Sequence, residues 1–236
     1  MSFATAEIVL AAIAAILAIT LHEAAHGYAA LALGDDTARR AGRLSLNPLR
    51  HVDPVGTLLL PGLLVLAHFV FHLPLILFGW AKPVPIGAAK FRDPRRGMMI
   101  IAAAGPAMNF LLAWLAAVVL TRAPPSPLEE SFLLSFILVN LVLGLFNLIP
   151  IPPLDGGRIA VGLLPLPLAR IWARMEGAGL VIVLLLLFVV PALLAELGVR
   201  FDPIRGALFS VLEPAFAAVM WLAGHPIGPG FGERYL

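Results

Sequence analysis

Residues 4–32 read ATAEIVLAAIAAILAITLHEAAHGYAALA, an apolar run that contains two histidines and a glutamate near its C-terminal end. About 20 consecutive apolar residues are enough for a helix to cross a bilayer. Ionisable side chains inside such a helix are costly and are usually functional. On a helix, His22 and His26 share a face because residues four apart are neighbours, and Glu23 lies beside them. The stretch therefore predicts a transmembrane helix that carries a chemical site.

The rest of the chain has the composition of a membrane protein. Of its 236 residues, 61% are hydrophobic and 13% are charged, whereas soluble domains are about 45–50% apolar and about 25% charged. The apolar runs are continuous rather than alternating, which favours helices over a barrel. We predict an all-α polytopic membrane protein, a bundle of five or six transmembrane helices whose further spans are 98–121, 129–149, 177–198 and 205–224.

The positions of the basic residues predict the orientation of these helices. Connections rich in Lys and Arg stay in the cytoplasm. Here the basic residues gather in three connections, as Arg39, Arg40, Arg43 and Arg50, as Lys82, Lys90, Arg92, Arg95 and Arg96, and as Arg158, Arg170 and Arg174. The net charge of +2 is therefore attributed to orientation in the lipid bilayer, and no nucleic-acid partner is expected.

A sixth apolar segment, residues 57–78, lies between two of these basic connections. If both connections stay in the cytoplasm, this segment cannot cross the bilayer once. Pro61, Gly62 and Pro74 would also interrupt a helix there. We expect a re-entrant or interfacial segment after the helix that carries the histidines, and the alternative is a plain sixth span.

The HEAAH motif predicts a metal site with hydrolytic chemistry. Two histidines four apart can bind one zinc ion, which lowers the pKa of water toward about 7, while Glu23 accepts the proton. The chain has no cysteine, so thiolate ligands are excluded. The competing interpretations are a pair of core histidines with Glu23 hydrogen-bonded between helices, and a membrane metal-ion carrier that uses the same side chains.

A catalytic zinc usually takes a third protein ligand. The candidates are Asp155, His51, Asp53, His68, His72, Glu176 and Glu213. Asp155 is favoured because it follows a span and a proline-rich break and precedes two glycines. HEAAH and Asp155 each lie toward the C-terminal end of their segment, so the spans 4–32 and 129–149 must be parallel for them to meet at one depth. Parallel spans require an odd number of crossings between them. One crossing at 98–121 satisfies this condition, and a full span at 57–78 would not.

Three separated motifs resemble the site-2 protease family of intramembrane zinc metalloproteases. They are HEAAHGYAA (22–30), AAAGPAMNF (102–110) and FNLIPIPPLDGGRI (146–159). The stretches SLNPLRHVDPVGTLLLP (45–61) and FGWAKPVPI (78–86) resemble a compact bacterial and archaeal branch of that family without an appended regulatory domain. Where that branch would carry asparagine after PVPI, this chain has Gly87.

The resemblance implies one Zn²⁺ per chain, held by His22, His26 and Asp155, with Glu23 as the general base. It implies that Asn147 holds substrate or the developing oxyanion. It also implies cleavage of a single-span membrane-protein substrate, in regulated intramembrane proteolysis, at the inner or plasma membrane of a bacterium or archaeon. The active site is expected to open toward the cytoplasm.

The resemblance and the spans together predict one integral-membrane metalloprotease domain over residues 1–236. Its catalytic core is expected over about 4–160 and its C-terminal helices over about 177–224.

Several further polar residues are candidates for secondary roles. Asn109 is expected to form an interhelical hydrogen bond, with a substrate contact as the alternative. His51 and Asp53 are expected either to gate water entry and orient a ligand, or to build a turn with the adjacent prolines. His68 and His72 are interpreted as core or interfacial histidines because no acid is adjacent to them.

Overall fold

The computed structural model describes residues 3–71, 79–122, 125–199 and 201–224. These residues form helices and connecting loops, with no strand among them. Five helices are long and apolar enough to cross a membrane: Ala6–Ala32 within α1 (Phe3–Ala32), α4 (Pro94–Arg122), α5 (Pro127–Asn147), the run Glu176–Glu196, and α10 (Pro203–Leu222). The predicted all-α, multi-pass architecture is confirmed, with five candidate spans in the part of the chain that the structure describes.

The shorter elements connect these spans. They are α2 (Thr37–Arg40), η1 (Pro48–His51), the π-helical turn η2 (Pro54–Leu59), α3 (Leu60–Phe71), η3 (Ala88–Lys90), α6 (Asp155–Leu163) and α7 (Leu166–Arg174). The fourth span consists of α8 (Glu176–Leu184), the π-helical turn η4 (Leu185–Val189) and α9 (Val190–Glu196). The π-helical turn ends at Val189, two residues before Pro191, which has no N–H to continue the α-helical ladder.

Polar caps set the starts of the long helices and explain why two of them begin before their apolar runs. The carboxylate of Asp93 accepts the N–H groups of Arg95 and Arg96 at 3.1 and 3.2 Å, so α4 begins at Pro94. Ser126 and Glu129 form a reciprocal capping box at the start of α5. Apolar length alone therefore places these helix starts a few residues too late.

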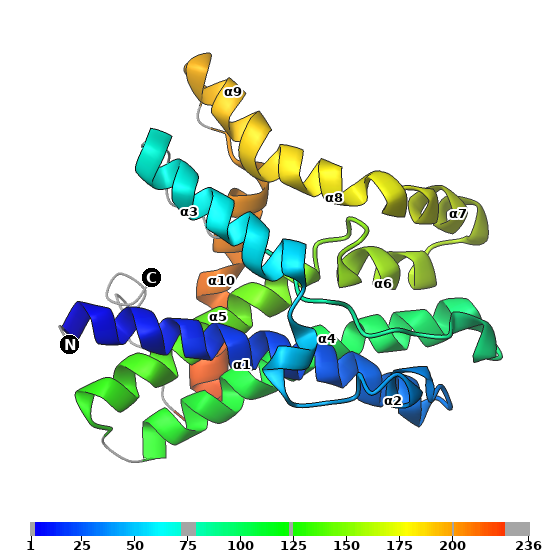
Figure 1. Cartoon of the computed structure of the whole chain (residues 1–236), viewed down its shortest axis with the longest axis horizontal. Helices are drawn as coiled ribbons and strands as arrows, with labels where there is room; N and C mark the ends of the chain where they lie inside the picture. Colours follow the sequence, from blue (N-terminus) through cyan, green and yellow to red (C-terminus); the bar gives the residue numbers. More distant parts are fainter. Residues whose placement is uncertain (1–2, 72–78, 123–124, 200, 225–236) are drawn as a thin grey trace.

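The spans pack through small residues and a compact apolar core. Buried side chains of α4, α5 and α10, including Ile137, Leu141 and Phe216, form that core. Helix α1 packs on α4 and α5, and Ala14 and Ala18 of α1 are fully buried. Small residues allow such close approach of helices in a membrane. Helices α1 and α5 run in the same direction with α4 antiparallel to both (Figure 1), so the predicted parallel arrangement is confirmed.

The segment predicted to re-enter begins and ends at the same place. The Trp80 N–H donates to the Gly56 carbonyl at 3.2 Å, and the Thr57 hydroxyl donates to the Trp80 carbonyl at 2.9 Å. Between these contacts the chain runs outward through η2 and α3 (Figure 1). Because the residues on both sides of the segment are hydrogen-bonded to each other, they lie at the same end of the bundle, which is the arrangement expected of a re-entrant segment.

Candidate metal centre

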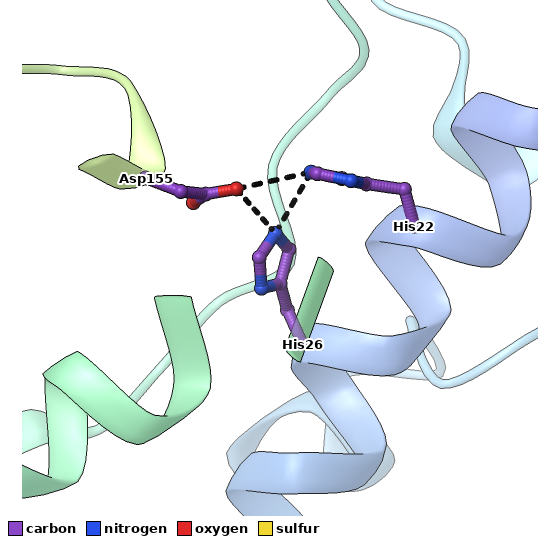
Figure 2. A group of neighbouring side chains, drawn as sticks. All are labelled: His22, His26 and Asp155. Atoms are coloured by element: carbon purple, nitrogen blue, oxygen red, sulfur yellow. Dashed lines mark hydrogen bonds and ion pairs between the residues drawn. The ribbon is translucent and has the colours of Figure 1, made fainter. Parts of the chain in front are cut away.

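Three side chains from two distant parts of the chain converge at one point. His22 and His26 project from the same face of α1, and Asp155 projects from the first turn of α6 (Figure 2). The Asp155 Oδ2 atom lies 3.1 Å from the His22 Nε2 atom and 3.3 Å from the His26 Nε2 atom. The two Nε2 atoms are 3.1 Å apart. All three residues are buried.

A chain of hydrogen bonds fixes the orientation of the His22 ring. The Asn140 amide donates to the Phe136 carbonyl, which can only accept, so the Asn140 Oδ1 atom must face Asn109. The Asn109 amide donates to that oxygen at 2.9 Å, and its own Oδ1 atom lies 2.6 Å from the His22 Nδ1 atom. The Nδ1 atom of His22 therefore carries a proton, and the Nε2 atom presents a lone pair.

The His26 ring is held in the same way by the backbone. Its Nδ1 atom lies 2.7 Å from the Ile101 carbonyl oxygen, which can only accept. The carbonyl belongs to the turn of α4 that precedes Pro106. Both imidazoles thus direct the Nε2 atom rather than the Nδ1 atom toward Asp155.

Three electron-rich atoms this close together require a positive charge among them, either a proton on one imidazole or a metal ion. Burial alone raises the pKa of the Asp155 carboxyl, but the neighbouring His22 and His26 outweigh burial and lower that pKa to about 2. The carboxylate is therefore ionised at neutral pH. Its Oδ2 atom is buried and accepts no hydrogen bond from the residues that the structure describes.

The arrangement fits a tetrahedral zinc ion. Ligand atoms about 2.0–2.2 Å from a tetrahedral zinc lie roughly 3.3 Å from one another. The three separations of 3.1, 3.1 and 3.3 Å approach this value. Two imidazoles and one carboxylate are also a ligand set typical of catalytic zinc, which leaves a fourth position for water or substrate.

Gly105 makes room for the two imidazoles. A Cβ atom at this position of α4 would lie 2.5 Å from the Cε1 atoms of both His22 and His26, and 2.6 Å from the His26 Nε2 atom. Ordinary contacts between carbon atoms are about 3.5–4.0 Å. A side chain larger than hydrogen at residue 105 would therefore displace both histidines.

The loop and helix that carry Asp155 are packed closely on their surroundings. A Cβ atom on Gly156 would lie 2.2 Å from the Leu148 carbonyl oxygen, so the turn after α5 approaches the start of α6 closely. At the other end of α6, the Arg95 guanidinium donates to the Val161 and Leu164 carbonyls at 2.8 and 2.6 Å. These contacts place Asp155 opposite α1.

Glu23 lies next to the converging side chains and is half-buried. Its Oε2 atom accepts the Val84 N–H at 3.3 Å, and Val84 belongs to the loop that follows the re-entrant segment. One carboxylate oxygen is thus engaged by backbone. No second hydrogen bond to this carboxylate occurs within the described part of the chain, so its Oε1 atom remains available to accept a proton.

Of the residues predicted around the site, Asn109 is the one whose side chain contacts a histidine of the site, and it does so from the side away from Asp155. The predicted interhelical hydrogen bond is present, to Asn140 of α5. Asn147 is half-buried at the end of α5, and its amide donates to the Leu143 carbonyl of its own helix at 3.0 Å.

His51 and Asp53 take part in the turns before the re-entrant segment. The buried His51 ring donates to the Ser45 carbonyl at 2.8 Å. Asp53 accepts the N–H groups of Val55 and Gly56 and so caps η2. These contacts agree with the interpretation that His51 and Asp53 build turns with the adjacent prolines. Their role in gating water entry stays a prediction.

The remaining candidates for a third ligand lie elsewhere. Glu176 forms an ion pair with Arg158 at 2.9 Å, and Glu213 is exposed on α10. His72 lies outside the described residues, as does the side chain of His68 on α3, so the expectation for these two histidines stays a prediction.

Two groups that support the histidines, one through Asn109 and one directly, lie outside the three motifs. Asn140 is the polar residue of an otherwise apolar stretch, LVNLV, which is a signal that could have identified it. The Ile101 carbonyl has no such signal, because every residue carries a carbonyl and only the packing of α1 on α4 selects this one.

Comparisons with known proteins agree with this geometry. A sequence model described as peptidase family M50 matches residues 125–190. The Bacillus subtilis protein named "Putative zinc metalloprotease YwhC" is 40% identical over 185 residues, which cover 75% of this chain and 78% of that protein. No solved structure matches the chain.

Two further relatives come from other microorganisms. The Mycolicibacterium smegmatis protein named "Putative zinc metalloprotease Rip2" is 34% identical over 188 residues, which cover 75% of this chain and 66% of the relative. "Zinc metalloprotease MJ0392" of Methanocaldococcus jannaschii is 37% identical over 78 residues, which cover 32% of this chain and 23% of the relative. The chain therefore belongs to peptidase family M50, the zinc metalloprotease family that its motifs resemble.

Proposed function

We propose that this protein is an intramembrane zinc metalloendopeptidase that hydrolyses a peptide bond in or near the transmembrane segment of a single-span membrane-protein substrate. The observation that carries the proposal is the convergence of the His22 and His26 Nε2 atoms and the Asp155 carboxylate beside Glu23, inside a bundle of five candidate spans. We further propose that this reaction serves regulated intramembrane proteolysis.

The residues divide the chemistry among them. His22, His26 and Asp155 would hold one zinc ion, which when bound supplies Lewis-acid polarisation of the scissile carbonyl and acidifies water. Glu23 accepts the proton of the attacking water and passes it to the leaving amine. Asn147 would donate to the developing oxyanion, for which its amide must exchange the Leu143 carbonyl for substrate.

We place the site near the cytoplasmic face of a bacterial or archaeal cell membrane. Helix α1 ends, α4 begins and α5 ends at the same end of the bundle as Asp155 (Figure 1). The basic residues that follow α1 and precede or begin α4 gather at this end, and Lys and Arg favour the cytoplasm.

The proposal is tested with purified protein in detergent and a panel of single-span substrates. Glu23→Gln should retain the zinc content of the wild type and lose cleavage, because the amide cannot accept the proton. Normal cleavage by zinc-loaded Glu23→Gln would refute the role of Glu23. If the wild type cleaves nothing but moves zinc across vesicle membranes, the carrier interpretation would replace the protease.

A further inference from the structure

The loop after the re-entrant segment is attached to the helix that carries the site. The Val84 N–H donates to the Glu23 Oε2 atom at 3.3 Å. The Val84 side chain is 6% exposed, and a Cβ atom on Gly27 of α1 would lie 3.3 Å from its Cγ1 atom. Val84 is therefore in contact with α1 one turn beyond Glu23.

Asp35 attaches the same loop to the end of α1. It lies three residues after Ala32 and is fully buried. Its carboxylate accepts the Gly87 N–H at 2.6 Å, the Thr37 N–H at 3.0 Å and the Thr37 hydroxyl, and it forms an ion pair with Lys90 at 3.0 Å. One buried carboxylate thus joins the end of α1 to two residues of the loop.

The loop approaches Asp35 closely at residue 87, where this chain has glycine. A Cβ atom on Gly87 would lie 2.9 Å from the Thr37 Oγ1 atom and 3.1 Å from the Asp35 Oδ1 atom. Both atoms are held by their hydrogen bond to each other, so neither can move away freely.

Asp36 provides a contrast within the same turn. It also forms an ion pair with Lys90, at 2.9 Å, and another with Arg40, but it accepts no backbone N–H of the loop among the described residues. Exposed ion pairs contribute little, whereas hydrogen bonds from backbone N–H groups to a buried carboxylate are among the stronger ones. Asp35 rather than Asp36 is therefore the residue that fixes the loop.

We propose that Asp35 is a positioning residue for Glu23. By fixing Gly87 and Lys90 at the end of α1, Asp35 keeps the Val84 N–H against one oxygen of the Glu23 carboxylate. The other oxygen is then directed toward the water from which Glu23 accepts a proton. This inference rests on the proposed function for its kinetic consequence but not for its structural one.

The test compares Asp35→Asn and Gly87→Ala with Asp36→Asn as the matched control. Asp35→Asn removes the negative charge that pairs with Lys90 and replaces one acceptor oxygen with an amide, and Gly87→Ala adds a methyl group that would push the loop away. We expect kcat to fall about tenfold in both variants, with KM changed less than about twofold and zinc content equal to that of the wild type. Asp36→Asn should stay within about twofold of the wild-type kcat.

A second measurement does not depend on catalysis. Because the chain has no cysteine, Val84→Cys introduces a single thiol at a buried position. Maleimide should label this thiol slowly in the otherwise unchanged chain and at least about tenfold faster when Asp35→Asn or Gly87→Ala is added. The labelling rate reports loop attachment even in a protein without protease activity.

Three outcomes would overturn the inference. They are an unchanged labelling rate in both variants, an unchanged kcat despite faster labelling, and an increase in kcat, which would mean that Val84 restrains Glu23 rather than orienting it. If Asp35→Asn does not fold, Gly87→Ala alone decides. Absence of cleavage by the wild type would instead refute the proposed function and leave the labelling experiment to judge the attachment.

Discussion

The substitution Gly105→Ala should disable metal binding while changing no ligand. The added Cβ atom would lie 2.5 Å from the Cε1 atoms of His22 and His26. Contact distances of about 3.5 Å require each ring to move by about 1 Å. Neither ring can do so freely, because the Nδ1 atoms are held at 2.6 Å by Asn109 and at 2.7 Å by the Ile101 carbonyl.

The expected magnitude follows from these restraints. Distances in a metal site must hold within about 0.2 Å, so a displacement of about 1 Å removes at least one good ligand. Overpacking in a closely packed interior costs about 1–3 kcal/mol, and each 1.4 kcal/mol is tenfold in affinity. We therefore expect zinc affinity to fall by about 100-fold, with proteolysis lost in proportion to zinc occupancy.

The assay is competition for zinc between the purified protein and a calibrated chelator. Gly144→Ala is the matched control, because residue 144 is a glycine of α5 that packs on α4 and its added Cβ atom would lie 3.3 Å from the nearest atom, the Asn109 Cβ atom. This variant should stay within about threefold of the wild type. If Gly105→Ala binds zinc within about twofold of the wild type, the packing of α4 against the imidazoles has been misjudged.

Two further predictions concern the contacts that support the site. Asn109→Ala removes the acceptor of the His22 Nδ1 proton, so zinc affinity in chelator competition should fall about 10–100-fold. Asn109→Asp keeps an acceptor oxygen and should recover most of this affinity. An equal loss of affinity in both variants would contradict the role of Asn109. Burial raises the pKa of Asp35, but hydrogen bonds from Thr37, Gly87 and Lys90 outweigh burial and hold it well below its usual range. Because the folded pKa is lowered, Asp35 stabilises the fold fully above the unfolded value of about 3.9 and loses this contribution as the pH falls below it. The stability difference between wild type and Asp35→Asn, from thermal unfolding, should therefore be full at pH 7 and shrink below about pH 4; a difference that grows in acid would contradict the sign.

The spans and the third ligand could be predicted because they depend on properties that add up along the chain. Apolar length located five helices, and the distribution of basic residues placed both ends of segment 57–78 on one side. Counting crossings then made α1 and α5 parallel, which brings Asp155 to the level of His22 and His26. These inferences depend on the apolar length of each segment, on the number of basic residues in each connection and on whether the number of crossings is odd or even. They therefore tolerate errors of a few residues at each helix end.

The supporting contacts could not be predicted because they depend on single atoms at interfaces between distant segments. Asp35 stands in the sequence GDD, which is typical of an exposed turn, yet it is fully buried through contacts with residues more than 50 positions away. Gly105 allows close packing of α4 on α1, and its specific neighbours there are the two imidazoles. Residue type alone does not reveal which backbone groups meet across such an interface.

The depth of the site explains how such polar groups are accommodated in an apolar bundle. His26 lies six residues and His22 ten residues before Ala32 at the end of α1, which corresponds to about 9 and about 15 Å along a helix. The hydrocarbon core of a bilayer is about 30 Å thick, so the site reaches no deeper than about its middle. Asp155, the third residue of the site, need not lie on a spanning helix, because α6 begins only eight residues after α5 ends and lies at the same end of the bundle. Water therefore needs to reach only this depth from one face, the face at which Asp35 attaches the loop to α1.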